Sequence, residues 1–329
     1  MSRRPRLGFL GVGWIGRQRL EVLADSGLAE VAMIADALPE VAGRAVQAAP
    51  DARLAESLEA MLAADLDGVV IATPSAAHAP QTRLALERGL AVFCQKPLAR
   101  TAAEAARVVA AARQADRLLD VDFSYRHVAG VPQLRELVQA GALGEIFAVD
   151  LTFHNAYGPD KPWFYDIALA GGGCVMDLGI HLLDLALWVL DFPAVAGIDG
   201  RLYAQGRPLP RPADRVEDYA VAQLVLETGA SVRMACSWRL AAGCDAVIEA
   251  AFYGTGGGAA LRNVNGSFYD FTVERFHGTR RECLAAPPDA WGGRALLGWT
   301  RRLAAGGGFD PAAERLVAVA QIMDTLYGR

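Results

Sequence analysis

The stretch Gly11-Val12-Gly13-Trp14-Ile15-Gly16 decides the fold of the N-terminal part of this chain. It has the spacing G-x-G-x-x-G, follows the apolar run 6–11 and precedes 14–26, where apolar residues recur at helical spacing. In that context the first glycine permits a tight turn and the second lets a pyrophosphate approach the backbone. The third lets the helix pack closely on the sheet, and the phosphate then lies at the helix N-terminus. We therefore expect a dinucleotide to contact Gly11, Gly13, Trp14, Ile15 and Gly16.

An acidic residue lies at the distance from these glycines that dinucleotide recognition requires. Asp36 ends the apolar run 31–35, about 20 residues further along the chain. A carboxylate at that point binds the ribose hydroxyls of NAD and repels the 2′-phosphate of NADP. Ala37 and Leu38 supply no cation beside it, and Arg44 lies a helical turn or more away. We expect NAD rather than NADP; the alternative is an ordinary glycine turn with a surface aspartate.

The pattern of apolar runs divides the chain into two parts. Short strand-like runs alternate with helical patterns up to residue 122, which predicts a doubly wound parallel sheet, a Rossmann domain, over 1–122. Over 123–329 we expect a substrate-binding and oligomerisation domain of α+β class with a large open, mostly antiparallel sheet. Its last helix is free to pack back on the first domain. One helix is predicted over 173–190, and strands are predicted over 195–202, 219–227, 231–238, 245–253 and 267–275.

Composition excludes several classes of protein. The net charge of −5 and the sequence pI of about 5.6 disfavour a nucleic-acid partner, because such proteins carry a basic stripe. The apolar run 173–192 contains Asp177, His181 and Asp184, so we expect no membrane span there. The five cysteines form no CxxC pair, which indicates a reducing, cytoplasmic compartment and neither disulfides nor a metal site.

Two further turns follow predicted strands of the parallel sheet. Ligands of such sheets lie outside the carboxyl ends of the strands, so we expect Thr73, Pro74 and His78 to line the nicotinamide side. Gln95-Lys96-Pro97 follows the next strand, and Pro97 favours a cis bond more than other residues do. Lysine occurs only at Lys96 and Lys161, and an ammonium group at the strand end can polarise a carbonyl or hydroxyl group. A solvated lysine and a surface histidine are the structural alternatives.

A carboxylate and an imidazole share one face of an otherwise apolar predicted helix. Asp177 and His181 are four residues apart in GGGCVMDLGIHLLD, which begins at Gly171. Histidine titrates near neutral pH and is suited to proton transfer beside a carboxylate. The alternative is a buried pair that only braces the structure.

Four elements of this sequence, in this order, resemble the Gfo/Idh/MocA family of glucose–fructose oxidoreductase, inositol dehydrogenase and their relatives. They are GVGWIG, ATPSAAH, the Lys96-Pro97 turn, and GGG followed by DLGIHLLD. The resemblance implies a nicotinamide cofactor, a sugar, cyclitol or related polyol as substrate, and a homodimer or homotetramer formed through the C-terminal sheet. It also implies that Lys96 and His181 act as acid and base, with Asp177 binding substrate or orienting His181. The family usually has glutamate where this chain has Gln95.

The resulting hypothesis is hydride transfer between NAD and a secondary hydroxyl group or ketone. Two alternatives stay open: a glycosidase that oxidises its substrate transiently with tightly held NAD, and a catalytically silent NAD-binding sensor. Aromatic faces suit sugar rings, and arginine suits hydroxyl, carboxylate or phosphate groups. On these grounds the candidate substrate contacts are Arg126, His154, Tyr157, Trp163 and Tyr165, each with ordinary packing as its alternative.

Overall fold

The computed structural model describes residues 4–329 and divides into two compact units. The first unit extends to Asp122 and includes Gly292–Ala320; the second contains Phe123–Trp291 and Gln321–Arg329. The sequence also predicts a boundary after residue 122, but it places 292–320 in the second domain. That segment belongs to the first unit because Leu296 and Trp299, both fully buried, are part of its apolar core.

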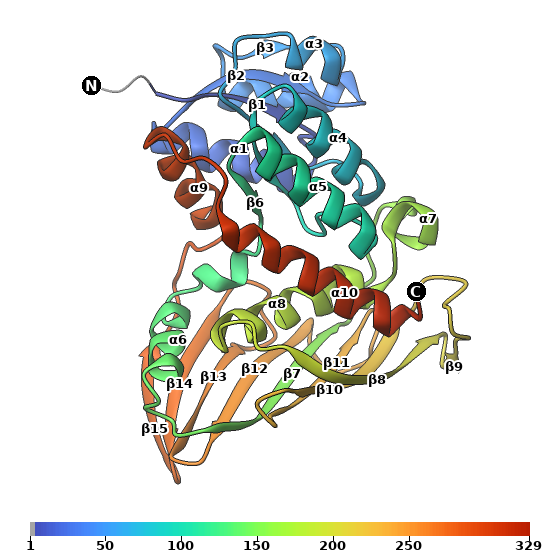
Figure 1. Cartoon of the computed structure of the whole chain (residues 1–329), viewed down its shortest axis with the longest axis vertical. Helices are drawn as coiled ribbons and strands as arrows, with labels where there is room; N and C mark the ends of the chain where they lie inside the picture. The colour runs from blue at the N-terminus through green and yellow to red at the C-terminus, as the bar shows by residue number, and fades with distance from the viewer. Residues whose placement is uncertain (1–3) are drawn as a thin grey trace. The chain divides into compact units, whose positions relative to one another are not determined.

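The first unit contains a six-stranded parallel sheet in the order β3-β2-β1-β4-β5-β6. This is the doubly wound order predicted from the sequence, and the order reverses between β1 and β4. The strands are β1 (Arg6–Leu10), β2 (Glu30–Ala35), β3 (Arg53–Leu54), β4 (Gly68–Ile71), β5 (Ala91–Cys94) and β6 (Leu119–Val121). The helices are α1 (Trp14–Ser26), α2 (Pro39–Ala45), η1 (Val46–Ala48), α3 (Leu58–Leu62), α4 (Ser75–Glu87), α5 (Ala102–Ala115), α9 (Arg294–Ala304) and η5 (Pro311–Glu314) (Figure 1).

Local sequence signals account for these elements. Strands β4 and β5 are entirely apolar and entirely buried, as expected when helices cover both faces of a parallel sheet. Helix α5 begins after Thr101, whose hydroxyl oxygen accepts the Glu104 backbone N–H at 3.2 Å. Helix α4 ends before Gly89, which has a φ of 79° that glycine adopts without strain. Because β1, β4 and β5 are paired in parallel, their carboxyl ends lie at one edge of the sheet.

The second unit contains a nine-stranded sheet in the order β15-β14-β13-β12-β7-β11-β10-β8-β9. Only the β7–β11 pair is parallel. The strands are β7 (Ile146–Asn155), β8 (Val195–Ala204), β9 (Arg207–Pro208), β10 (Tyr219–Leu226), β11 (Ser231–Ser237), β12 (Ala246–Gly254), β13 (Gly257–Asn263), β14 (Phe271–His277) and β15 (Arg280–Ala285). The helices are η2 (Ser124–His127), α6 (Val131–Gln139), η3 (Pro162–Tyr165), α7 (Ile167–Ala170), η4 (Val175–Gly179), α8 (Ile180–Val189) and α10 (Arg315–Tyr327), the last of which contributes to both units.

Helices of the second unit cover one face of its sheet. Figure 1 shows α6 and α8 on the same side of the strands. In β7, Val149, Leu151 and Phe153 are buried, whereas the alternate residues are only partly buried, as period-two alternation requires. The stretch Ile167–Val189 is long and apolar enough to cross a membrane by length and composition alone, with a mean hydropathy of 1.4. Because 83% of an 18-residue window within it is buried inside the fold, its apolar character is that of a core helix.

The structure differs from the sequence-based expectation in three elements of the second unit. Strand β13 was not predicted because its glycines and alanines lack the β-branched signature of strands. Strand β15 was not predicted because it is a charged edge strand, RRECLA. The predicted helix over 173–190 begins with one π-helical turn, η4, before α8.

Candidate active site

The glycine turn leaves room at one position and none at the other two. A Cβ atom on Gly11, whose φ is 82°, would lie 2.6 Å from the Ala72 carbonyl oxygen. A Cβ atom on Gly16 would lie 2.1 Å from the Gly11 carbonyl oxygen. A Cβ atom on Gly13 would meet no atom within 4 Å, although the turn leads directly into α1. The open space at Gly13 fits the close approach of a pyrophosphate to the helix N-terminus.

Asp36 is held against this turn at the end of β2. Its carboxylate accepts the backbone N–H of Val12 at 2.8 Å and that of Leu38 at 3.0 Å. Two apolar side chains border the same turns: Trp14 is 65% exposed and Leu38 is 53% exposed. Ile15 is partly buried at the start of α1. The residues present therefore fit a dinucleotide whose phosphates would be held at Gly13 and whose ribose would be held at Asp36.

His78 braces two turns of the first unit. Its Nδ1 lies 2.6 Å from the Pro97 carbonyl oxygen, and its Nε2 lies 2.6 Å from the Thr73 carbonyl oxygen. The residue is 2% exposed, and burial lowers the pKa of its imidazole. Both ring nitrogens thus face backbone, whereas the sequence analysis expected this side chain to line the nicotinamide. Pro74 is exposed at the same strand end, and the Thr73 hydroxyl donates to Gln81 Oε1 at 2.6 Å.

Gln95 belongs to a buried polar network at the ends of β5 and β6. Its Nε2 donates to Asp122 Oδ2 at 2.5 Å, and Arg19 Nε donates to the same oxygen at 2.6 Å. All three side chains are at most 7% exposed. A glutamate at position 95 would place a second carboxylate against Asp122, and two buried carboxylates at that distance cannot both ionise. Asp122 therefore gives a physical reason for the amide in place of the glutamate that is usual in the resembled family.

Lys96 differs in burial from the residues on either side of it in the chain. It is partly exposed, although the residues on both sides, 91–95 and 97–99, are buried. The Lys96–Pro97 peptide bond is cis, as the sequence allowed. Lys96 thus follows β5 at the carboxyl edge of the sheet, the edge that carries Gly13 and Asp36.

In the second unit, Asp177 and His181 lie on the accessible stripe of an otherwise buried helical segment. Between Gly171 and Val189 the partly exposed residues are Asp177, His181 and Trp188, and all others are buried. Asp177 sits in the π-helical turn η4, a feature often found at functional sites. The structure therefore brings the carboxylate and the imidazole to the same side of the helix.

Two residues that the sequence analysis did not single out support this pair. Trp238, 3% exposed at the end of β11, donates its indole Nε1–H to Asp177 Oδ2 at 3.1 Å. Tyr125 is buried, and the centroid of its ring lies 5.1 Å from that of the His181 imidazole at an interplanar angle of 52°. Burial raises the pKa of the Tyr125 phenol far above its usual value, so it stays protonated. Each contact joins residues more than 50 positions apart, and local sequence patterns carry no signal for it.

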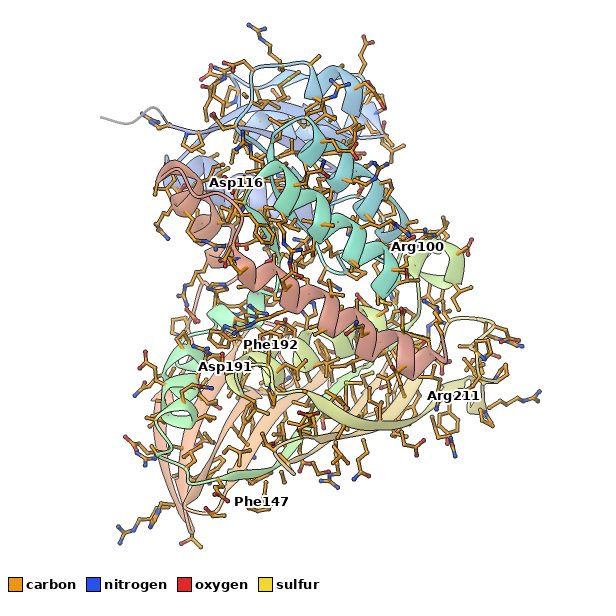
Figure 2. The ribbon with its side chains drawn as sticks, in the orientation of Figure 1. Arg100, Asp116, Phe147, Asp191, Phe192 and Arg211 are labelled. Atoms are coloured by element: carbon orange, nitrogen blue, oxygen red, sulfur yellow. The ribbon has the colours of Figure 1, made fainter. Side chains whose placement is uncertain are left out.

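Arg126 pairs with a buried carboxylate of the second unit. Its guanidinium makes a bidentate pair with Asp184, Nε to Oδ2 at 2.7 Å and a terminal nitrogen to Oδ1 at 2.5 Å. It also lies 5.6 Å from the ring of Phe192, which follows α8 and is labelled with Asp191 in Figure 2. Burial raises the pKa of Asp184, and Arg126 opposes that shift. A guanidinium committed in this way is a structural partner of α8, in contrast with the predicted substrate contact.

His154 lies on the face of the second sheet that is opposite to the His181 helix. Phe153 packs toward Tyr125 at 6.1 Å, so His154, the next residue of β7, faces the opposite side of the sheet. There its Nδ1 lies 2.8 Å from the Ser237 hydroxyl oxygen. The sheet thus separates His154 from the helix that carries His181.

Tyr157, Trp163 and Tyr165 lie in the segment between β7 and α7. The Tyr157 hydroxyl donates to Asp245 at 2.6 Å, and the Tyr165 hydroxyl donates to the Pro159 carbonyl oxygen at 2.8 Å. The Tyr165 ring packs edge-on against Trp238 at 5.8 Å, which connects this loop to the partner of Asp177. Within residues 4–329, no group of three histidine, cysteine, aspartate or glutamate side chains has the arrangement of a metal site.

Comparison with known proteins agrees with this architecture. Residues 6–123 match a family model described as an oxidoreductase family with an NAD-binding Rossmann fold, and residues 131–260 match the GFO/IDH/MocA C-terminal domain. The chain is 30% identical over 291 residues to D-apiose dehydrogenase of Paraburkholderia graminis, covering 88% of this chain and 75% of that protein. It is 35% identical over 218 residues to D-glucoside 3-dehydrogenase of Escherichia coli K12, covering 62% of this chain. The chain spans only 59% of the length of that second relative.

A solved structure is similar over the whole chain. GenD2 from gentamicin A biosynthesis, in complex with NAD, superposes with a TM-score of 0.83 at 25% identity and covers 99% of this chain and 94% of that one. The similarities span both units, and each unit contains the motifs described above. The chain therefore belongs to the Gfo/Idh/MocA oxidoreductase family, with an NAD-binding Rossmann domain followed by the family's C-terminal domain.

Proposed function

We propose that this protein is an NAD-dependent oxidoreductase that interconverts a secondary hydroxyl group and a ketone on a sugar, cyclitol or related polyol. The observation that carries the proposal is the accessible stripe of Asp177 and His181 on a buried helix, in a chain that also has the open glycine turn. A bound nicotinamide supplies hydride transfer, and the protein supplies orientation and proton transfer. Family membership supports the reaction class.

Three side chains carry the proton transfer and its electrostatic support. In the oxidation direction the His181 imidazole accepts the hydroxyl proton, and in the reduction direction it returns the proton to the new alkoxide. The Asp177 carboxylate, fixed by the Trp238 N–H, orients the imidazole or a substrate hydroxyl group. The Lys96 ammonium group donates a hydrogen bond to the reacting oxygen and stabilises the developing negative charge.

We propose NAD as the preferred cofactor over NADP. Asp36 points at the turn that would hold the adenosine ribose, and its two nearest backbone donors, Val12 and Leu38, bring no side-chain cation. A 2′-phosphate there would meet the Asp36 carboxylate, which would repel it. Steady-state kcat/KM with each cofactor tests this, and an equal or higher value with NADP would overturn it.

The proposed substrate class follows the relatives and the aromatic loop. Two proteins similar to this chain are named for activity on D-apiose and D-glucosides. Tyr157, Trp163 and Tyr165 remain candidate contacts, because aromatic faces suit the apolar faces of sugar rings. Arg126 and His154 are not among the proposed contacts, since one is paired with Asp184 and the other faces away from His181.

We further propose a cytoplasmic homo-oligomer assembled through the C-terminal sheet. The sheet face opposite α6 and α8 offers a surface for a second copy (Figure 1). All five cysteines are free thiols, which suits a reducing compartment. Light scattering tests the assembly; a monomer at micromolar concentration would overturn it.

Native mass spectrometry of protein purified without added nucleotide, followed by a sugar and cyclitol panel, tests the activity. Bound NAD(H) whose redox state changes with one substrate, with release of NADH, is the expected result. NAD that survives turnover without release would point to a glycosidase with a tightly held cofactor. Absence of NAD uptake would contradict the roles given to Gly13 and Asp36.

A further inference from the structure

The turn that starts the helix of Asp177 and His181 is held by one buried glutamate. Glu217, 0% exposed, precedes β10. Its Oε2 accepts the Gly173 N–H at 2.9 Å, and its Oε1 accepts the Val175 N–H at 2.8 Å. Its carbonyl oxygen accepts the intervening Cys174 N–H at 3.1 Å. One residue thus satisfies three successive N–H groups at the helix N-terminus, where a carboxylate is also favoured by the helix dipole.

The same turn has no space for side chains. A Cβ atom on Gly173 would lie 1.9 Å from the Glu217 carbonyl oxygen. A Cβ atom on Gly172 would lie 2.1 Å from the Tyr327 hydroxyl oxygen. The glycines at these positions therefore admit Glu217 and Tyr327 into direct contact with the backbone of the turn.

The end of α10 completes the contact. The Tyr327 hydroxyl donates to Glu217 Oε1 at 2.8 Å, and both residues are fully buried. Arg329 donates to the Gly171 carbonyl oxygen at 2.6 Å and lies 4.8 Å from the Tyr327 ring. Arg211, labelled in Figure 2, donates to the Thr325 carbonyl oxygen at 2.6 Å and fixes the same end of α10.

Asp218, the residue after Glu217, is connected to the Asp177 carboxylate through Trp238. The Asp218 carbonyl oxygen accepts the Trp238 backbone N–H at 2.7 Å, and Trp238 in turn donates its indole N–H to Asp177. Two consecutive residues thus hold the start of the π-helical turn and the hydrogen-bond donor of Asp177. A shift at this point would change the position of Asp177 relative to its partner.

We propose that Glu217 and Tyr327 are positioning residues of the reaction, which set the placement of Asp177 and His181 through the glycine turn. This inference rests on the proposed function only for its kinetic readout. Neither residue contacts substrate in the proposal. They act on proton transfer through the first turn of the helix, where a displacement of about 1 Å can cost about 100-fold in rate.

The test compares three variants of the full-length protein. Tyr327→Phe removes one hydroxyl group, and Glu217→Gln places an amide N–H₂ against an N–H of the turn. Tyr203→Phe is the matched control, because Tyr203 lies in β8 and packs on Tyr219. Rates are normalised to NADH-binding sites, so that a loss of folded protein is not counted as a loss of kcat.

We expect kcat to fall about fivefold in Tyr327→Phe and about 100-fold in Glu217→Gln, with the NADH Kd changed less than twofold. Tyr203→Phe should keep the parent kcat. A kcat per binding site within twofold of the parent in both test variants would overturn the inference.

A second readout does not depend on activity. Nitrogen-15 NMR of the histidines, with His181 assigned through His181→Gln, should show an altered His181 titration in the two test variants and not in Tyr203→Phe. An unchanged His181 titration in both variants would also overturn the inference. If the parent oxidises no sugar or cyclitol while His181 responds as expected, the proposed function fails and the positioning role stands.

Discussion

Replacing Gln95 by glutamate tests the electrostatic account of the first unit. The parent network contains one carboxylate, Asp122, which accepts from Gln95 at 2.5 Å and from Arg19 at 2.6 Å. In Gln95→Glu the donated N–H would be replaced by an oxygen facing Asp122 Oδ2. The shared site is almost fully buried, so one of the two carboxyl groups must hold a proton.

The free-energy cost of keeping one carboxyl group protonated depends on how far the pH lies above the pKa of that group. An unperturbed glutamate has a pKa of about 4.3, and each pKa unit corresponds to about 1.4 kcal/mol. Holding the proton at pH 7 therefore costs about 4 kcal/mol, and at pH 5 about 1 kcal/mol. Attraction to Arg19 offsets part of this, so we expect the free energy of unfolding to fall by about 2–4 kcal/mol at pH 7. Because the folded-state pKa is raised, the stability of the variant should recover as pH falls toward 5.

Urea unfolding of the parent and the variant at the two pH values measures this difference. The double variant Gln95→Glu with Asp122→Asn removes the second carboxylate and should recover part of the lost stability. The rest stays lost, because one atom of the amide at position 122 cannot both donate to position 95 and accept from Arg19. Gln223→Glu, on the exposed side of β10, is the control and should change stability by less than about 0.5 kcal/mol. Equal stability of Gln95→Glu and the parent at pH 7, with the same pH dependence, would refute the reasoning.

Three further predictions concern the glycine turn, the proposed base and the buried glutamate. Gly13→Ala should leave urea stability unchanged but weaken NAD binding at least tenfold by calorimetry, whereas Gly16→Ala, which clashes with Gly11, should destabilise by about 1–3 kcal/mol. His181→Ala should lower kcat about 10²- to 10⁴-fold with the NAD Kd unchanged, and a parallel loss of NAD binding would indicate a structural residue. Burial raises the pKa of Glu217, so parent stability relative to Glu217→Gln should fall as pH rises above 4.5; a constant difference would contradict that shift.

Local sequence patterns are sufficient to predict those features that depend on residues close together in the chain. The helix predicted over 14–26 has those bounds in the structure, because the glycine turn fixes its start and Gly27 takes a left-handed φ of 62° at its end. The parallel order of the first sheet follows from alternating strands and helices. Strand ends and helical spacing also predict where Lys96 and the Asp177–His181 stripe lie in the fold, while their roles stay a prediction.

The same local patterns do not predict contacts between residues that lie far apart in the chain. Glu217 lies more than 40 residues from the turn it holds, and Trp238 lies 61 residues from Asp177. Arg126 is predicted as a substrate contact because arginine suits hydroxyl, carboxylate or phosphate groups. Its buried partner, Asp184, is 58 residues away, so local patterns do not reveal the pair. These pairings depend on the tertiary packing of the second unit, which hydrophobic periodicity does not specify.

Isotope transfer is the most direct test of the central claim. Sugars and cyclitols deuterated at each secondary carbon in turn would be incubated with the protein and NAD, and the nucleotide analysed by mass spectrometry. The account predicts deuterium in NADH from one carbon of one substrate, and its loss in His181→Ala. Tight NAD binding with no deuterium transfer from any substrate would contradict the account.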